Sequence, residues 1–405
     1  MKKIALHWQI LIAIFLAIIV GLVFPNQVKY IGWMGTIFLR LLKMIVVPLV
    51  FFSLVSGISN IGSGSNLGRI GLKTLVYYFS TSLIAILTGL FFVNIIQPGK
   101  NIELSPGSSA ELPDLIATPL SETLMNIVPE NIVDALAKGN MLSIIFFALL
   151  FGFFITQLEA KYRHPLENFF SASFEVMMKL TLFIIRFAPL GIFGIVAGTV
   201  SEHSGLGNLL SGLAKFIGTA VSGLLIHGLI TLPIILLLVA KINPIKHIKA
   251  VGTALLTAFS TASSNATLPL TMESVEKNAG VSNRVSSFTL PLGATINMDG
   301  TALYELVVVG FVAQLYGIEL SVSQQFIVVV TALLSSIGTA GVPMASFVTM
   351  NIIFAAVGLP IEAIAFILPI DRPLDMLRTS VNVYGDTVGA STIAALEGEK
   401  LSTQL

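Results

Sequence analysis

The sequence of 405 residues contains no cysteine, and only 11% of its residues are charged. Without cysteine, the chain can form neither disulfide bonds nor thiolate metal sites. A typical soluble domain has about 25% charged residues, so this chain has too few polar groups for a surface that faces water. Its net charge of +1 creates no long-range field that would attract nucleic acid. The HExxH motif of zinc proteases, the P-loop and the GxSxG motif of serine hydrolases are also absent.

Hydrophobic residues make up 55% of the chain, and its mean hydropathy is +0.92. A helix that crosses a bilayer needs about 20 apolar residues. Apolar stretches of about this length or longer occur at 5–24, 34–60, 73–97, 140–158, 168–198 and 209–240. The first stretch is too long for the core of a signal peptide and lacks a small-residue cleavage site, so we interpret it as a spanning helix. The sequence therefore predicts an all-α integral membrane protein.

Two further apolar stretches are each interrupted by polar residues. The first begins near residue 250 and is interrupted at 260–267, and the second runs from 326 to 357 with an interruption at 335–343. Each arm is about half the length of a crossing, as in a re-entrant hairpin. Each stretch precedes a long apolar helix, at 283–317 and 361–394. Paired interrupted segments of this kind predict a transporter whose binding site lies near the middle of the bilayer.

The distribution of Lys and Arg predicts the orientation in the membrane. Basic residues occur in the loops at 62–73, 159–167 and 241–249, whereas the long loop at 99–139 is acidic. Cytoplasmic loops carry an excess of Lys and Arg, so we expect the N-terminus and the basic loops in the cytoplasm and the acidic loop outside. The compact loops and the lack of a targeting extension predict a multi-pass protein of the inner (cytoplasmic) membrane of a bacterium or archaeon.

The last apolar helix carries a polar face. Its members are Asp371, Asp375, Arg378, Asn382 and Asp386, which fall within about 80° of one another on a helix, and Thr379 widens the arc by about 20°. A charge inside the membrane costs at least about 2.5 kcal/mol, so this face must meet a polar interior. Arg378 is a candidate to bind a substrate carboxylate through two parallel hydrogen bonds, and Asp375 is a candidate for its amino group. A structural ladder of ion pairs is the alternative.

The preceding helix contains a polar interruption at 295–301. Asn297, Thr301 and Glu305 share one face by their spacing of four residues, whereas Asp299 points the opposite way on a regular helix. Gly293 and Gly300 permit local unwinding, which would free carbonyl oxygens for a hard cation such as Na⁺. Asp299 could then serve a site on the far side of the helix. The hydroxyl groups available there in the third apolar stretch are those of Tyr78, Thr81 and Ser82.

Glu305 is a lone carboxylate in apolar surroundings. Burial favours its neutral form, so it can take up a proton on one side of the membrane and release it on the other. The alternative is a glutamate that only pairs with a basic side chain.

Four sequence motifs resemble those of the glutamate/aspartate transporter family, the dicarboxylate/amino acid:cation symporters, which include prokaryotic homologues of the excitatory amino acid transporters. The motifs are Ser263-Ser264 with TLP at 267–269, LPLGATINMDGT at 290–301, GTAGVP at 338–343, and Leu374-Asp375 with Arg378-Thr379, Asn382 and Gly385-Asp386. Their order matches the family, and the resemblance covers essentially the whole chain, including Tyr77-Tyr78.

The resemblance implies eight transmembrane helices plus two re-entrant helical hairpins, arranged as inverted repeats in an elevator-type transporter. A scaffold that also forms a homotrimer would comprise helices 1 and 2 (1–60) and helices 4 and 5 (140–198). The transport domain would comprise helix 3 (73–97) and residues 209–405, with helix 6, hairpin 1 at about 244–277, helix 7 at about 283–317, hairpin 2 at about 322–357 and helix 8 at about 361–394. Membrane lipids and the substrate would be its partners, with no nucleic acid and no organic cofactor.

The resemblance also implies the site residues. Substrate contacts would be Ser264, Thr301, Val342, Asp375, Arg378, Thr379 and Asn382. One Na⁺ would bind Gly293, Asn297, Asn382 and Asp386, a second Thr295, Ser336, Ile337 and Thr339, and a third Tyr78, Thr81, Ser82, Asn297 and Asp299. Members that couple to protons carry glutamate at the position of Glu305, whereas some that use Na⁺ alone carry glutamine. We therefore expect co-transport of H⁺ as well as Na⁺.

The chain departs from the family at several positions. Members usually have an additional arginine near the site, but the two corresponding positions are Ala262 and Met376, and Arg372 is a candidate substitute. This departure leaves counter-transport of K⁺ open. Ser346 stands where members usually have a glycine in the gate hairpin.

Other functions remain to be compared with import of glutamate or aspartate. A carrier of the same fold could transport neutral amino acids or C4-dicarboxylates, but Arg378 argues against the former and Asp375 against the latter. An intramembrane aspartyl protease would need two helix-borne aspartates, for which Asp386 and Asp299 are available, yet it would leave the interrupted segments unexplained. A cation channel would need a ring of carboxylates and no arginine. We therefore expect a transporter and not an enzyme.

Overall fold

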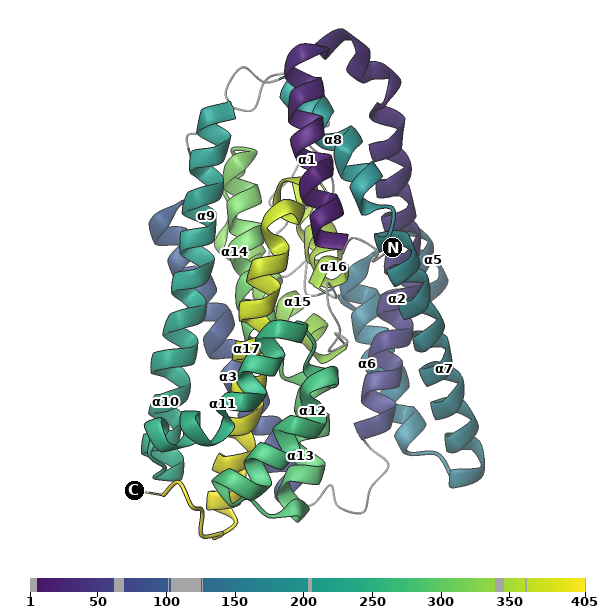
Figure 1. Ribbon diagram of the computed structural model, residues 1–405. Coiled ribbons are helices and arrows are strands. Elements are labelled where there is room, and N and C mark those ends of the chain that lie inside the picture. Colours follow the sequence, from purple (N-terminus) through teal and green to yellow (C-terminus); the bar gives the residue numbers. More distant parts are fainter. Residues whose placement is uncertain are drawn as a thin grey trace, which may run out of the picture.

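The computed structural model describes residues 6–61, 69–100, 102, 125, 127–202, 206–338, 346–360 and 363–404. Among these residues, the regular structure is helical, apart from one isolated bridge between Ile242 and Gln404. This agrees with the predicted all-α class. Figure 1 shows the long helix α17 (Ile364–Leu396) in the middle of the molecule, with α9 on one side and α2, α6 and α7 on the other.

One group of helices comes mainly from the first half of the chain. It comprises α1 (Leu6–Val23), a 3₁₀ turn (Pro25–Tyr30), α2 (Gly32–Ile61), α5 (Ile132–Lys138), α6 (Met141–Thr156), α7 (Ala160–Ile185) and α8 (Ala188–Glu202). Helix α1 packs against α8, and α2 packs against α6, α7 and α8. Apolar side chains of α2, α6 and α7, such as Leu54, Ile145 and Phe170, form one core, which also includes Ile352 from the second half of the chain.

The apolar stretch at 168–198 is not one helix, because α7 ends at Ile185 and α8 begins at Ala188. The cause is Pro189, which lies in the first turn of α8. A proline ring clashes with the carbonyl group four residues earlier and has no N–H to donate, so a continuous helix would lose a hydrogen bond at this point.

A second group of helices surrounds α14 (Asp299–Leu315). It comprises α3 (Arg69–Ile96), α9 (Leu206–Ile226), α10 (Leu232–Ile235), α11 (Pro244–Thr261), α12 (Ser264–Glu273), α13 (Asn283–Ile296), α15 (Val322–Gly338), α16 (Ser346–Val357) and α17. Three π-helical segments, His227–Thr231, Leu236–Ala240 and Ser274–Ala279, extend α9, α10 and α12. Every residue of α14 except Gly310 and Gln314 is buried, so α14 is the centre of this group.

The interrupted stretches form two pairs of consecutive helices, α11 with α12 and α15 with α16, and the members of each pair pack against each other. The first pair turns at Ala262, whose φ of 51° is in the left-handed region. Ser263 then caps α12 by accepting a hydrogen bond from the backbone N–H of Ala266 at 3.2 Å. The turn between α15 and α16, at 339–345, lies outside the described residues. That both pairs are re-entrant stays a prediction.

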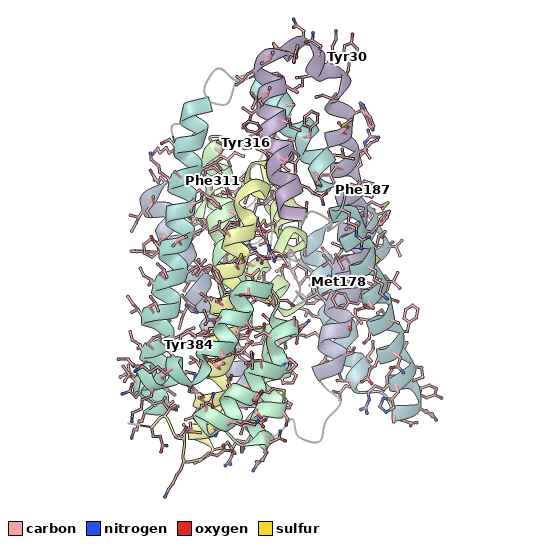
Figure 2. The ribbon with its side chains drawn as sticks, viewed as in Figure 1. Tyr30, Met178, Phe187, Phe311, Tyr316 and Tyr384 are labelled. Atoms are coloured by element: carbon pink, nitrogen blue, oxygen red, sulfur yellow. The ribbon has the colours of Figure 1, made fainter. Side chains whose placement is uncertain are left out.

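Among the described residues, three helices are long and apolar enough to cross a membrane: Arg69–Ile96, Ser211–Ala240 and, taking α13 and α14 together, Asn283–Leu315. Large apolar side chains on the outside of α3 and of the 211–240 helix are exposed, for example Phe91 and Leu238. By contrast, Phe311 on α14 and Tyr384 on α17 are buried, toward the upper and the lower part of the view in Figure 2. The number of eight crossings and the division into scaffold and transport domain stay predictions.

Candidate functional site

The polar face of α17 surrounds a fully buried arginine. The Nη2 atom of Arg378 lies 3.0 Å from a carboxylate oxygen of Asp371 and 3.0 Å from one of Asp375. The ring of Tyr304, from α14, lies against the guanidinium group, with 4.0 Å between the ring centroid and Cζ. The Nε and Nη1 atoms of Arg378 have no hydrogen-bond partner among the described residues. The guanidinium group is thus paired on one nitrogen and has donors left for a further acceptor.

A second arginine approaches the same carboxylate. Nη1 of Arg372 lies 3.6 Å from Oδ2 of Asp375, and the side chain of Arg372 is 31% exposed. Its position one to two turns before Arg378 is the one suggested from the sequence. The two positions at which the family resemblance led us to expect an additional arginine differ in environment. Ala262 is buried in the left-handed turn after α11, whereas Met376 on α17 is partly exposed.

The helix containing the NMDGT motif is interrupted, as the sequence predicts. Helix α13 ends at Ile296 and α14 begins at Asp299, so Asn297 and Met298 lie between two helices. The break exposes the first N–H groups of α14, and that of Gly300 donates to Oδ1 of Asn382 at 2.7 Å. The amide nitrogen of Asn382 lies 3.2 Å from the hydroxyl oxygen of Thr301. The start of α14 is thereby bonded to the polar face of α17.

Several oxygen atoms converge beside this break. The amide nitrogen of Asn297 donates to Oδ1 of Asp386 at 2.9 Å, and Oδ1 of Asn297 is buried with no partner among the described residues. Gly293 faces the same space, because a Cβ atom on it would lie 2.5 Å from the hydroxyl oxygen of Tyr78 and nearer still to Asp386. The hydroxyl group of Tyr78 donates to the carbonyl of Thr289 at 2.9 Å. Carboxylate, amide and carbonyl oxygens are the ligands that hard cations prefer, so this donor set fits Na⁺.

Asp299, the first residue of α14, contacts two other helices. Its Oδ1 accepts a hydrogen bond from the hydroxyl group of Ser82 at 2.6 Å, and its Oδ2 lies 3.1 Å from Nε2 of His227. Thr81 is buried next to them, but its hydroxyl group donates to the carbonyl of Tyr78 in its own helix. No group of three or more His, Asp or Glu side chains in the described part of the chain could hold a metal ion. A cation here would therefore need hydroxyl, amide and backbone oxygens as well.

His227 is fully buried in the helix that continues α9, and the sequence motifs did not identify it. A signal was available, since a single ionisable residue in the middle of the apolar stretch 209–240 is a functional candidate by default.

Glu305 is buried in α14, and the hydroxyl group of Thr349 on α16 donates to its Oε1. Its other oxygen, Oε2, has no hydrogen-bond partner among the described residues. Thr349 also contacts the backbone carbonyl of Ser346 at 3.0 Å, which links this glutamate to the start of α16. Thr349 was not identified from the sequence, because no local pattern relates it to Glu305.

For the other predicted site residues, the structure shows burial, exposure or the position of the backbone. Ser264 and Thr379 are both buried, the first at the start of α12 and the second on α17. Thr295 is exposed, and its hydroxyl group bonds carbonyls of its own helix. Ser336 and Ile337 belong to α15, but the structure describes only their backbone, and Thr339 and Val342 lie outside the described residues. The second Na⁺ site predicted from the sequence, with Thr295, Ser336, Ile337 and Thr339, therefore stays a prediction.

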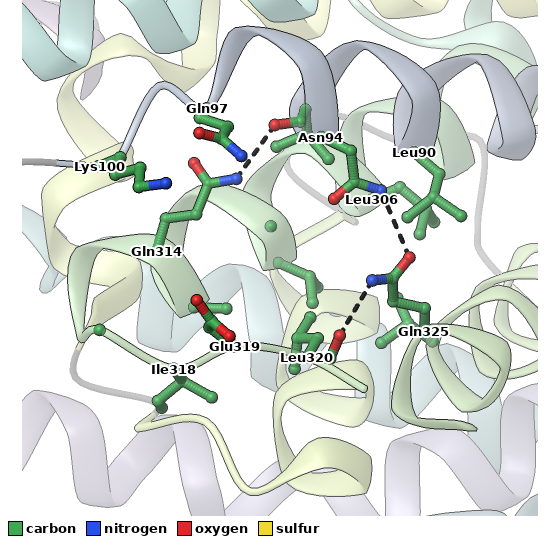
Figure 3. Close-up of a pocket in the computed structure, with 16 residues that line it drawn as sticks. Leu90, Asn94, Gln97, Lys100, Leu306, Gln314, Ile318, Glu319, Leu320 and Gln325 are labelled. Atoms are coloured by element: carbon green, nitrogen blue, oxygen red, sulfur yellow. Dashed lines mark hydrogen bonds between the residues drawn. The ribbon is translucent and has the colours of Figure 1, made fainter. Parts of the chain in front are cut away.

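A pocket of about 330 Å³ lies elsewhere, between the last turns of α3 and α14 and the beginning of α15 (Figure 3). Its lining is rich in amides. Asn94 on α3 donates to Gln325 on α15 at 3.3 Å, and Gln314 on α14 donates to the carbonyl of Val93 at 3.0 Å. None of the predicted site residues lines this pocket. The predicted substrate site is thus distinct from it.

Buried charges on two adjacent helices, one of them broken, define a class of protein, the helical membrane transporters. Residues 6–396 match the Sodium:dicarboxylate symporter family, and the chain belongs to this family. The chain is 39% identical over 409 residues to the proton/sodium-glutamate symport protein of Geobacillus stearothermophilus. The match covers 98% of this chain and 96% of the relative. It is 37% identical over 412 residues to the proton/glutamate-aspartate symporter of Escherichia coli (strain K12), with 98% and 93% covered. An excitatory amino acid transporter of Caenorhabditis elegans is 36% identical over 414 residues, with 91% and 82% covered.

Membership of this family makes the chain a multi-pass membrane protein and a cation-coupled symporter. The family recognised from the four motifs is thereby confirmed, as is the prediction that the chain is a transporter and not an enzyme.

Proposed function

We propose that this protein imports an acidic amino acid, glutamate or aspartate, together with Na⁺ and H⁺. The observation that carries the proposal is the buried guanidinium group of Arg378, whose Nε and Nη1 have no partner among the described residues. Unpaired donors in a dry site are costly, and a substrate carboxylate would satisfy them. Asp375, one turn away, would receive the substrate amino group, and Ser264, Thr301, Thr379, Asn382 and Val342 would complete the site. Relatives whose names specify glutamate or aspartate support this substrate class.

For the cations, we propose two sites around the broken helix. The Asp386 site uses Asp386, Asn297, Asn382 and the backbone of Gly293. The Asp299 site uses Asp299 with Tyr78, Thr81, Ser82 and Asn297. The remaining Na⁺ site expected from the sequence, with Thr295, Ser336, Ile337 and Thr339, rests on the family resemblance alone. The unpaired Oδ1 of Asn297 and the space left by Gly293 support the Asp386 site. The name of the Geobacillus stearothermophilus relative includes both the proton and sodium, which supports coupling to both ions.

For the mechanism, we propose an elevator in a homotrimer of the cytoplasmic membrane. The transport domain, 73–97 and 209–405, would slide against a scaffold of 1–60 and 140–198. The helix contacts support this division, because α2 packs chiefly against α6, α7 and α8, whereas α14 packs chiefly against α3, α9 and α17. The apolar core around α14 nevertheless extends to Phe38 of α2 and Ile192 of α8, so the two parts meet through apolar side chains. The proposed ligands that the structure describes lie on or directly beside α3, α12, α13, α14, α15 and α17, all within the proposed transport domain.

The direct test is uptake of radiolabelled glutamate and aspartate into proteoliposomes, with Na⁺ and pH gradients imposed separately. We expect uptake that requires inward Na⁺ and increases with an acidic outside solution. If alanine or a C4-dicarboxylate competes for uptake and glutamate and aspartate do not, the result would instead support an alternative carrier of the same fold.

Arg378→Ala should abolish binding of both substrates, because truncating one partner of a buried, hydrogen-bonded charge pair between two molecules costs about 2–5 kcal/mol of affinity. Arg378→Lys should also bind poorly, because a lysine cannot offer two parallel hydrogen bonds. Arg186→Ala is the matched control, since Arg186 is exposed in the turn between α7 and α8. Isothermal titration with glutamate measures the difference. Wild-type affinity in Arg378→Ala would contradict the proposed carboxylate contact.

Glu305→Gln should remove the effect of an imposed pH gradient while leaving Na⁺-driven uptake in place. The amide keeps the shape of the side chain and a hydrogen bond with Thr349, but it cannot carry a transported proton. Glu159→Gln, at an exposed position in the loop before α7, serves as the control. If Glu305→Gln keeps the pH dependence of the wild type, the proton travels by another route.

A further inference from the structure

His227 occupies an unusual position in the 211–240 helix. It begins the π-helical segment His227–Thr231, directly after α9 ends at Ile226. A π-helical turn holds one more residue than an α-helical turn, so it changes the direction in which the following side chains point, and such turns often occur at functional sites. His227 is fully buried, and the residues on either side of it, from 223 to 230, are otherwise apolar. A leucine or phenylalanine would be the ordinary residue at such a position.

The imidazole ring makes one hydrogen bond in the structure, to Asp299. Nε2 lies 3.1 Å from Oδ2, while Nδ1 has no partner among the described residues. A carboxylate accepts hydrogen bonds and does not donate them, so the hydrogen atom of this bond belongs to Nε2. Burial of the unpaired Nδ1 is unfavourable, and the contact with Asp299 is what compensates for it. The bond to this carboxylate therefore stabilises the buried ring in its position.

The carboxylate of Asp299 is held by donors from two helices at once. Ser82 on α3 binds Oδ1 at 2.6 Å, and His227 binds Oδ2 at 3.1 Å. One lone pair on each oxygen is thereby engaged, which fixes the plane of the carboxylate group. The same Oδ2 borders the backbone of α17, because a Cβ atom on Gly385 would lie 3.4 Å from it and 2.8 Å from the amide nitrogen of Asn297. Asp299 is thus oriented beside Asn297, the residue that both proposed cation sites share.

We propose that His227 is a positioning residue for the Asp299 cation site and sets how strongly this site binds Na⁺. This inference rests on the proposed function, in which Asp299 is a Na⁺ ligand. A hydrogen bond to a ligating carboxylate fixes its orientation, and loss of such an outer partner typically weakens metal binding by about 10–100-fold. His227 acts through Asp299 and not through contact with the substrate. Its removal should therefore change the dependence on Na⁺ much more than substrate affinity at saturating Na⁺.

The test uses the purified full-length protein in detergent and two measurements. The first is the thermal unfolding midpoint as Na⁺ replaces choline at constant ionic strength, and the second is aspartate binding over the same Na⁺ range. His227→Phe keeps a ring of similar size but removes the donor, and we expect the half-maximal Na⁺ concentration to rise about tenfold or more in both measurements. His227→Gln places an N–H group at about the distance of Nε2 and should restore a value close to that of the wild type.

His247→Phe is the matched control. His247 is also fully buried, binds Thr387 through Nε2 at 3.2 Å, and has no partner at Nδ1 in the described part of the chain, but it does not contact Asp299. If His227→Phe does not fold, the pair His227→Asn and His227→Gln provides the test. The two side chains differ by one methylene group, and the shorter amide does not reach Asp299. Only His227→Asn should then require more Na⁺.

Three results separate the possibilities. An unchanged Na⁺ dependence in both His227→Phe and His227→Asn would overturn the positioning role. A lower Na⁺ requirement in these variants would also overturn it, because the imidazole would then compete with the cation. If the wild-type protein itself shows no Na⁺-dependent stabilisation and no Na⁺-dependent binding of aspartate, the proposed function fails, and the inference about His227 fails with it.

Discussion

Replacing Gly293 by alanine tests the Asp386 cation site directly. The new Cβ atom would lie 2.5 Å from the hydroxyl oxygen of Tyr78 and even nearer to a carboxylate oxygen of Asp386. Non-bonded carbon atoms are most favourable at about 3.5–4.0 Å, so one of these groups must move by about 1 Å. Both are restrained, Tyr78 by its bond to Thr289 and Asp386 by its bond to Asn297. Overpacking of this kind costs about 1–3 kcal/mol.

If this free energy is paid mainly when the cation binds, Na⁺ affinity should fall by about 5–150-fold. The assay is the Na⁺ dependence of aspartate binding to purified protein, measured by isothermal titration. Gly218→Ala on α9 and Gly252→Ala on α11 are matched controls, because a Cβ atom at either position meets no other atom within 4 Å. Alanine is also favoured over glycine in a helix by about 0.5–1 kcal/mol, so both controls should be at least as stable as the wild type.

A Gly293→Ala protein that binds Na⁺ as well as the wild type would refute the reasoning. The space between Tyr78 and Asp386 would then lie outside any cation site. A Gly293→Ala protein that loses aspartate affinity equally at all Na⁺ concentrations would likewise contradict a cation site at this position.

Two further predictions concern other contacts of the α3, α14 and α17 helices. Tyr304→Leu should weaken glutamate binding by about 2 kcal/mol, since it removes the ring that lies against Arg378, whereas Tyr304→Phe keeps a ring and should bind nearly normally; equal losses in the two variants would contradict a role for the ring. Glu397, just after α17, accepts hydrogen bonds from Arg69 and Lys73 at 2.7 Å each, and these bonds lower its pKa from 4.5 to about 2. A lowered carboxyl pKa stabilises the folded protein above pH 4.5, and this contribution is lost as the pH falls toward 2. Glu397→Gln should therefore reduce the thermal unfolding midpoint at pH 7, and its difference from the wild type should shrink below pH 4.5; a difference that does not change with pH would contradict the ion pair.

Local periodicity was enough to predict the polar face of α17. The side chains of Asp371, Asp375 and Arg378 project together because their spacing fits the helix repeat, and the structure places them in one ion-paired cluster. The same reasoning placed Asp299 on the opposite side of the next helix. It also named Ser82 with Tyr78 and Thr81 as hydroxyl groups near Asp299, and the structure shows a hydrogen bond from Ser82 to Asp299. That these residues bind a cation stays a prediction.

The spacing of residues within one helix could not predict contacts between segments that are far apart in the sequence. His227 and Asp299 are 72 positions apart, and Thr349 and Glu305 are 44 apart, so no repeat within one helix relates them. The division of the 168–198 stretch into α7 and α8 was missed for a different reason. The apolar count dominated the interpretation, although Pro189 was visible in the sequence.

The sequence alone determined the solvent of this protein and the chemistry of its interior. A chain that is 55% hydrophobic and 11% charged must place most of its surface in lipid, and four ordered motifs establish the family. The tertiary structure decided which buried charges meet. It brought His227 to Asp299, Tyr304 to Arg378 and Thr349 to Glu305, because the pairing of helices depends on packing between segments that are far apart in the chain.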